Sequence, residues 1–62
     1  MKLKTLLIRV DEDVTIVIYR DFGEPLFKGY VKEVTNEFLE ADVFKIYPCH
    51  TSRENYLEIF IY

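Results

Sequence analysis

The sequence predicts an α+β fold: a four-stranded antiparallel sheet of two β-hairpins, with a short N-terminal helix and a short helix between the hairpins. The hairpins are indicated by four runs rich in β-branched and aromatic residues. A turn-rich segment joins the first two runs, and a polar segment joins the last two. Leucines at helical spacing before the first run, and a capping pattern between the pairs, indicate the helices. Because the 62 residues contain no linker-like segment or repeat, a single domain over residues 1–62 is expected.

The two expected helices are short. Before residue 11, apolar residues recur at positions i, i+3, i+4 and i+7, which is typical of one helix face, although the branched residues of this run also allow a strand. A second helix is expected over residues 36–41, because Thr35 is a favourable N-cap and Val34 and Leu39 are spaced as a hydrophobic staple. The apolar stripe of the first helix consists of Leu3, Leu6, Leu7 and Val10.

The first hairpin is expected to join residues 14–20 to residues 26–33 through a turn over residues 21–25. Placing Arg20 opposite Phe27 separates the side chains into two sets, because successive residues of a strand point to opposite faces. The core face then holds Val14, Ile16, Ile18, Phe27 and Val31, and the outer face holds Thr15, Val17, Tyr19, Lys28, Tyr30 and Lys32.

The second hairpin is expected to join residues 43–47 to residues 56–62 around a polar loop over residues 48–55. Placing Lys45 opposite Glu58 gives an ion pair and again separates the side chains into two sets. One face then holds Phe44, Ile46, Leu57 and Ile59, and the other holds Val43, Lys45, Tyr47, Tyr56, Glu58 and Phe60.

These registers assign all five tyrosines to the outer face of the sheet, together with three lysines. Tyrosine and lysine combine an apolar body with a polar tip, so a face rich in both is typical of a contact surface. A second copy of the chain is the first partner expected, since two-fold dimers are common. Single-stranded or distorted nucleic acid is the alternative, because bases stack on aromatic rings while lysines follow phosphates. The candidate interface or nucleic-acid-binding residues are Tyr19, Lys28, Tyr30, Lys32, Lys45, Tyr47, Tyr56, Phe60 and Tyr62.

Composition and charge exclude several classes of protein. Half of the residues are apolar, which excludes a disordered segment, and the net charge of −3 argues against general adhesion to nucleic acid. A bilayer-spanning helix needs about 20 apolar residues, and lysines and an arginine interrupt the most apolar stretch. The single cysteine and the lack of a signal-peptide pattern favour a reducing cytoplasm, with no membrane partner.

Two further clusters contain groups that could carry chemistry. Asp11, Glu12 and Asp13 offer oxygen ligands to a divalent metal, with a solvated acidic turn as the favoured alternative. Cys49 and His50 supply a nucleophile and a base, but neighbours in sequence need not face each other, so a non-catalytic surface loop is favoured. No catalytic residue is therefore assigned and no cofactor is required, and Asp11 and Asp13 are the only metal candidates.

Residues 14–31, 36–40 and 43–47 resemble small proteins encoded in bacterial prophages and mobile elements, most of which have no assigned function. Some of these are anti-CRISPR proteins, including one type with an oligomeric sheet, similar to a single-strand-binding fold, that acts on DNA. The resemblance implies a phage or mobile-element accessory protein that antagonises host defence as a homo-oligomer contacting DNA. The alternatives are an acidic protein that binds a nuclease (CRISPR) effector and a structural oligomerisation module. A non-enzymatic binding protein is favoured over metal-dependent DNA nicking, in which Asp11 and Asp13 would anchor the metal.

Overall fold

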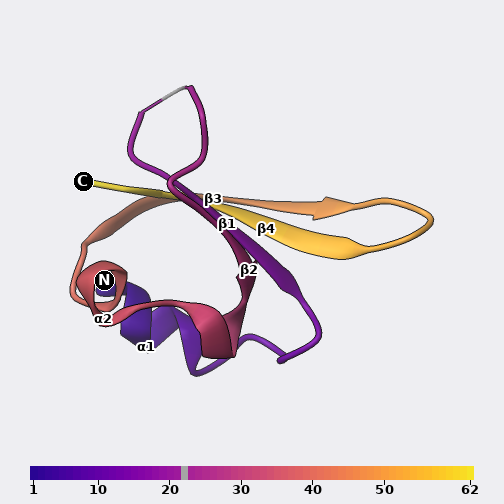
Figure 1. The fold of residues 1–62 in the computed structure, drawn as a ribbon, viewed down its shortest axis with the longest axis horizontal. Helices are drawn as coiled ribbons and strands as arrows, with labels where there is room; N and C mark the ends of the chain where they lie inside the picture. The colour runs from indigo at the N-terminus through magenta and orange to yellow at the C-terminus, as the bar shows by residue number, and fades with distance from the viewer. Residues whose placement is uncertain (22) are drawn as a thin grey trace.

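A four-stranded sheet and a layer of short helices on one side of it make up the fold (Figure 1). The computed structural model describes residues 1–21 and 23–62; the expected turn over residues 21–25 includes Phe22, which lies outside the described residues. In Figure 1 the helices lie at the lower left, and one hairpin projects away from them to the right. The elements are α1 (Leu3–Leu7), β1 (Thr15–Tyr19), β2 (Phe27–Tyr30), the 3-10 helix η1 (Val31–Glu33), α2 (Asn36–Leu39), β3 (Val43–His50) and β4 (Asn55–Ile61).

The sheet is mixed, with the strand order β2-β1-β4-β3. Both expected hairpins form, since β1 and β2 are antiparallel and so are β3 and β4. The prediction of a wholly antiparallel sheet is wrong, because the central strands β1 and β4 run parallel. After β2 the chain passes through η1 and α2 to the far edge of the sheet, and β4 then returns between β3 and β1. This crossover gives β4 the direction of β1.

The first hairpin pairs two residues away from the predicted register. Ile18 lies opposite Phe27, where Arg20 was expected. A shift of two residues leaves the paired side chains of β1 and β2 on their predicted faces, because the faces alternate with a period of two. Strand β2 ends at Tyr30, whose backbone N–H donates to the Glu33 carboxylate over 2.9 Å, and the chain turns into η1.

The second hairpin is also shifted by two residues, and it contains a bulge. Tyr47 lies opposite Glu58, where Lys45 was expected, and the ladder is irregular between Val43 and Lys45. The bulge places Phe44 on the outer face and packs Val43 against the core, so both of these predicted orientations are wrong. Pairing continues to His50 and Asn55, and only residues 51–54 form the loop.

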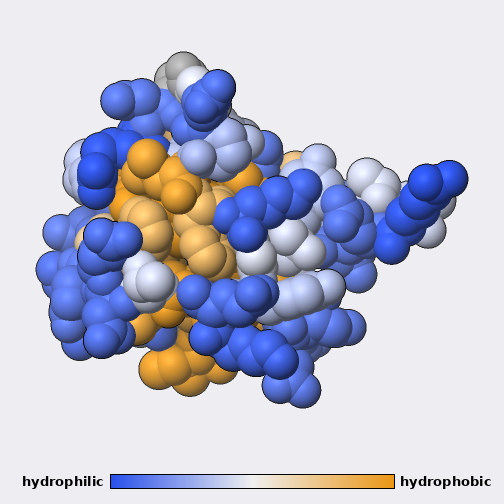
Figure 2. All heavy atoms as spheres, in the orientation of Figure 1, coloured by the Kyte–Doolittle hydropathy of each residue, from blue (hydrophilic) through white to orange (hydrophobic). Residues whose placement is uncertain are grey.

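The core lies between the sheet and the helices. The predicted stripe of the first helix is confirmed: Leu3 and Leu7 are buried, and Leu6 and Val10 pack against the same cluster. Hydrophobic residues remain visible in Figure 2 between the β1–β2 connection at the top and the helices, while the projecting hairpin end is hydrophilic. The remaining buried members of the cluster are Ile16, Ile18, Val34, Ile59 and Ile61.

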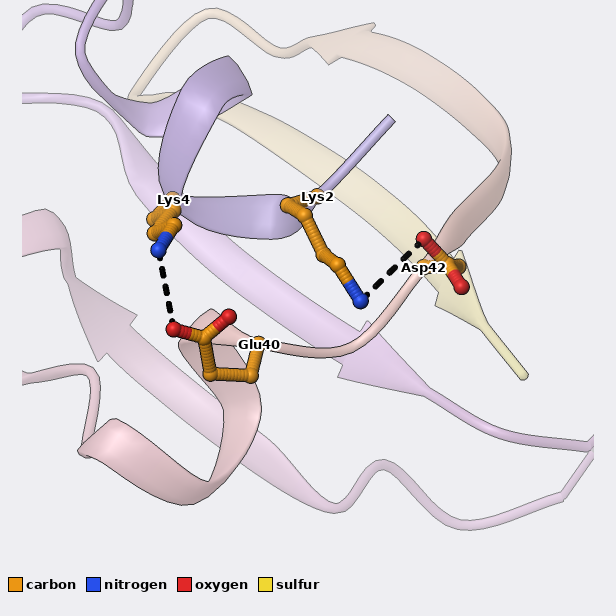
Figure 3. Close-up of polar contacts among 4 residues, drawn as sticks. All are labelled: Lys2, Lys4, Glu40 and Asp42. Atoms are coloured by element: carbon orange, nitrogen blue, oxygen red, sulfur yellow. Dashed lines mark hydrogen bonds and ion pairs between the residues drawn. The ribbon is translucent and has the colours of Figure 1, made fainter.

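The N-terminal segment is fastened to the chain between α2 and β3. Two ion pairs join these segments, Lys4 Nζ to Glu40 Oε1 at 2.8 Å and Lys2 Nζ to Asp42 Oδ1 at 3.7 Å (Figure 3). All four side chains are about half exposed or more, and exposed pairs contribute roughly 0–1 kcal/mol each. A bridge between residues 2 and 42 adds backbone pairing here, so hydrogen bonds as well as charges hold α1 beneath the sheet.

Candidate interface on the outer face of the sheet

The side of the sheet that faces away from the helices is called the outer face. Alternation along the four strands brings its side chains together, and the bulge adds Phe44. The residues of the outer face are Thr15, Val17 and Tyr19 from β1, Lys28 and Tyr30 from β2, Phe44, Lys45, Tyr47 and Cys49 from β3, and Tyr56, Glu58 and Phe60 from β4, with Tyr62 just beyond.

Five rings form an aromatic cluster on this face: Tyr19, Phe44, Tyr47, Phe60 and Tyr62. Phe60 lies at its centre, stacked on Tyr19 with centroids 5.0 Å apart and met edge-on by Tyr47 at 5.7 Å. Phe44 contacts Phe60 at 6.1 Å and Tyr62 at 4.9 Å. Phe60 is 6% exposed, whereas Phe44, Tyr47 and Tyr62 are 45%, 39% and 74% exposed. The ring contacts order the cluster, and its rim is open to a partner.

Glu58 is the polar centre of the outer face. The Tyr19 hydroxyl donates to its Oε2 over 3.1 Å, and the Cys49 thiol lies 3.8 Å from its Oε1. In the part of the chain that the structure describes, no cation lies within ion-pairing distance of this carboxylate. A hollow of about 370 Å³ opens beside it, lined by Tyr19, Gly23, Tyr47, Glu58 and Phe60.

The surroundings of Glu58 raise the pKa of two phenols. Partial burial raises the pKa of Tyr19 above its ordinary value of 10.0, and the hydrogen bond with Glu58 and its negative charge raise it further. Hydrogen bonding with Cys49 and its charge raise the pKa of Tyr56, and partial burial and Glu58 add to the effect. Both phenols are therefore held in the neutral form.

Replacing Glu58 with glutamine is expected to lower the pKa of both Tyr19 and Tyr56. The negative charge that opposes phenolate formation is lost. Because the folded-state pKa values are raised, the contribution of these phenols to stability is present below the unfolded pKa of about 10 and is lost as the pH rises through the folded values. An ultraviolet titration of phenolate, with circular dichroism to exclude unfolding, measures the shift. Glu37→Gln on α2 is the control, and identical curves for the two variants would contradict the expectation.

Two of the three predicted lysines lie on the outer face, at opposite edges of the sheet. Lys45 places its Nζ 5.3 Å from the centroid of the Tyr47 ring. Lys28 lies on the other edge strand, opposite Val17. Lys32 does not follow the prediction, because it belongs to η1 rather than to β2. Its side chain borders a groove between α1 and the η1–α2 segment and also the hollow beside Tyr30, so it lies apart from the other two lysines.

The predicted tyrosines all avoid the core, but they do not form one group. Tyr19, Tyr47 and Tyr62 belong to the aromatic cluster, together with the predicted Phe60. Tyr56 lies opposite Cys49, and Tyr30 borders a separate hollow with Glu12, Asp13 and Lys32. Sequence reasoning missed Phe44 and Glu58 as site residues. The place of Glu58 between Tyr56 and Phe60 in the alternating pattern was the available signal for its position, whereas the bulge gave no signal for Phe44.

The side chains of the acidic segment are not gathered into one cluster. Asp11, Glu12 and Asp13 are all exposed, and Asp11 borders a different hollow from Glu12 and Asp13. Among residues 1–21 and 23–62, no group of three or more His, Cys, Asp or Glu side chains could hold a metal ion. The structure thus gives no support to a metal anchored by Asp11 and Asp13.

Cys49 and His50 do not form a catalytic pair. They are consecutive residues of β3 rather than of a loop, so their side chains point to opposite faces of the sheet. Cys49 lies beside Glu58, whereas His50 Nδ1 is hydrogen-bonded to Asn55 Oδ1 across the hairpin. The two groups cannot exchange a proton directly.

Comparisons with known proteins found no matching family model, curated protein or solved structure. The resemblance to prophage proteins and its implications for function thus stay predictions. Among the described residues, none of the helices has the length and apolar character needed to cross a membrane.

Proposed function

We propose that this chain is a non-enzymatic self-association module and that its outer face binds a second copy. The observation on which the proposal rests is the aromatic cluster, a set of ordered rings on a face that no helix among the described residues covers. Ordered rings lose little side-chain freedom on binding, and aromatic side chains are enriched in protein interfaces. Three of the five rings keep more than a third of their surface exposed, which leaves apolar area to bury.

The size of the chain also supports self-association. A domain of about 60 residues buries only about 60% of the surface of its unfolded chain and is marginally stable alone. A stable two-protein interface removes about 800 Å² from each partner. This is less than a fifth of the 4513 Å² that the chain exposes, and a face spanning four strands can supply it.

The charges of the outer face favour protein over nucleic acid. Glu58 lies among the rings on which bases would stack, and a carboxylate there repels phosphates. Among residues 1–21 and 23–62, only Lys28 and Lys45 are lysines of this face, and they lie at its opposite edges. The whole chain carries a net charge of −3. DNA contact and antagonism of host defence stay predictions from the resemblance, and the test below includes DNA.

The wild-type chain is expected to be a dimer by size-exclusion chromatography with light scattering, and Tyr30→Ser with Tyr56→Ser is expected to be monomeric. Both side chains lie on the outer face and outside the core, so their loss removes interface area without opening the core. Ile8→Ser is the control, because Ile8 is 83% exposed on the helical side and its replacement should leave the dimer intact. A monomeric wild-type chain that binds a fluorescent single strand at low salt, and loses this binding in the Tyr30/Tyr56 variant, would overturn the proposal in favour of nucleic acid.

A further inference from the structure

Lys28 and Glu58 occupy equivalent positions on either side of β1. Val17 lies opposite Lys28 on β2 and opposite Glu58 on β4, so the three residues form one row across the outer face. Neighbouring strands are about 4.8 Å apart, which places the two charged residues at similar distances from β1. Neither Lys28 nor Glu58 has an ion-pair partner in the part of the chain that the structure describes. Val17 between them is 6% exposed.

We propose that two copies pack outer face to outer face about a two-fold axis that runs along β1, so that Glu58 of each copy pairs with the partner's Lys28. This arrangement rests on the proposed self-association and specifies its geometry: the partner covers β2, β1 and β4, with Tyr19 and Phe60 of the aromatic cluster, and β3 lies beyond the partner's edge. A two-fold axis parallel to β1 and midway between the stacked sheets exchanges the β2 side of one copy with the β4 side of the other. Stacked sheets commonly keep their strands within about 30° of each other, as this axis requires. The symmetry repeats each contact, so the pair forms twice.

The same axis also brings compatible side chains together in the row next to that of Lys28, Val17 and Glu58. Thr15 lies opposite Tyr30 on one side and Tyr56 on the other, so Tyr56 of one copy comes over the partner's Tyr30. Val17 comes over the partner's Val17, which places apolar groups together at the centre. Rings therefore meet rings and opposite charges meet, as a self-complementary interface requires.

Other axes parallel to the strands leave the charges unpaired. An axis along β4 brings Glu58 over the partner's Glu58. Two like charges facing each other in an interface weaken association strongly. An axis midway between β1 and β4 brings Glu58 over the partner's Val17, which buries a carboxylate without a cation. The positions of Lys28 and Glu58 therefore select the axis along β1.

The surface between the two charged residues can receive the partner's side chains. A hollow of about 320 Å³ lies there, lined by Val17, Tyr19, Lys28, Tyr56 and Glu58 together with residues from the two loops. Glu54 from the β3–β4 loop also borders it. This second carboxylate adds negative charge where the partner's Lys28 enters, so it favours the same arrangement.

Reversing the charges one at a time tests the arrangement. Lys28→Glu and Glu58→Lys are each expected to raise the dimer dissociation constant by about tenfold or more, because each replaces two ion pairs with two like-charge contacts. An equimolar mixture of the two variants is expected to recover the dimer, since in the mixed dimer both contacts again join opposite charges. Light scattering of each variant and of the mixture measures the association, and circular dichroism verifies the fold.

Lys45→Glu is the matched control, because it makes the same charge change on the same face but outside the proposed pair, and it should leave the dimer largely intact. Recovery in the mixture cannot arise from damage to either monomer. Unchanged dimers in both single variants, or folded variants that stay monomeric when mixed, would overturn the axis along β1. Self-association itself would still stand if Tyr30→Ser with Tyr56→Ser abolished the wild-type dimer, and a monomeric wild-type chain would remove both proposals.

Discussion

Replacing Ile59 with alanine is expected to lower the free energy of unfolding by about 2–5 kcal/mol, the usual cost of removing a large aliphatic side chain from a core. Ile59 is fully buried in β4, where it lies between Ile18 of β1 and Ile46 of β3. A chain of 62 residues has a stability of roughly 3–9 kcal/mol at typical values per residue. The substitution therefore removes a large part of the total, and urea unfolding followed by circular dichroism measures it.

Ile8→Ala provides the control for Ile59→Ala, because the same atoms are removed from a side chain that is 83% exposed. Its effect is expected to stay within about 0.5 kcal/mol. Both variants must be compared at one protein concentration, since self-association adds to the apparent stability. Equal losses for the two variants would contradict the position assigned to the core between the sheet and the helices.

The faces of the strands could be predicted from the sequence although the registers could not. Alternation in residues 15–19 and 56–61 is a local property, and it assigned Ile16, Ile18 and Ile59 to the core. Both hairpin registers were wrong by two residues, an error that preserves the faces. The positions of the tyrosines therefore followed from the sequence, whereas their cross-strand neighbours did not.

The strand order and the bulge depend on contacts between distant parts of the chain. Nothing local distinguishes a parallel from an antiparallel neighbour for β1, because a branched apolar run suits either one. The path of the chain through η1 and α2 determines that β4 runs parallel to β1. The same path places Lys32 in η1, away from the sheet. The centre of the site was missed for a related reason. Glu58 was expected to pair with Lys45, but in the actual register it lies opposite Tyr47 and forms no ion pair with a described residue.

Deleting Phe44 is expected to preserve the fold and to cost about 1–3 kcal/mol, the value of two aromatic contacts at 0.5–1.5 kcal/mol each. Val43 already lies opposite Ile61, and Lys45 lies opposite Phe60, so removing the residue between them leaves a regular ladder with every other side chain on its present face. Most single-residue deletions in a strand reverse the faces beyond them. Amide hydrogen exchange along β3 and β4, together with urea unfolding, measures whether the pairing survives.

Deleting Tyr47 is the matched control, because it removes an exposed aromatic residue from the same strand where the ladder is regular. Either Ile46 must then leave the core face, or Pro48 and the residues beyond it must move by one position. If Pro48 moves into the position of Tyr47, it occupies a ladder position that requires a hydrogen-bond donor, and proline has no N–H. Its ring then also lies on the opposite face of the sheet. We therefore expect a larger loss of stability and of exchange protection than for the deletion of Phe44. Equal losses would mean that Phe44 is not the extra residue of the bulge and that the outer face of β3 is built in another way.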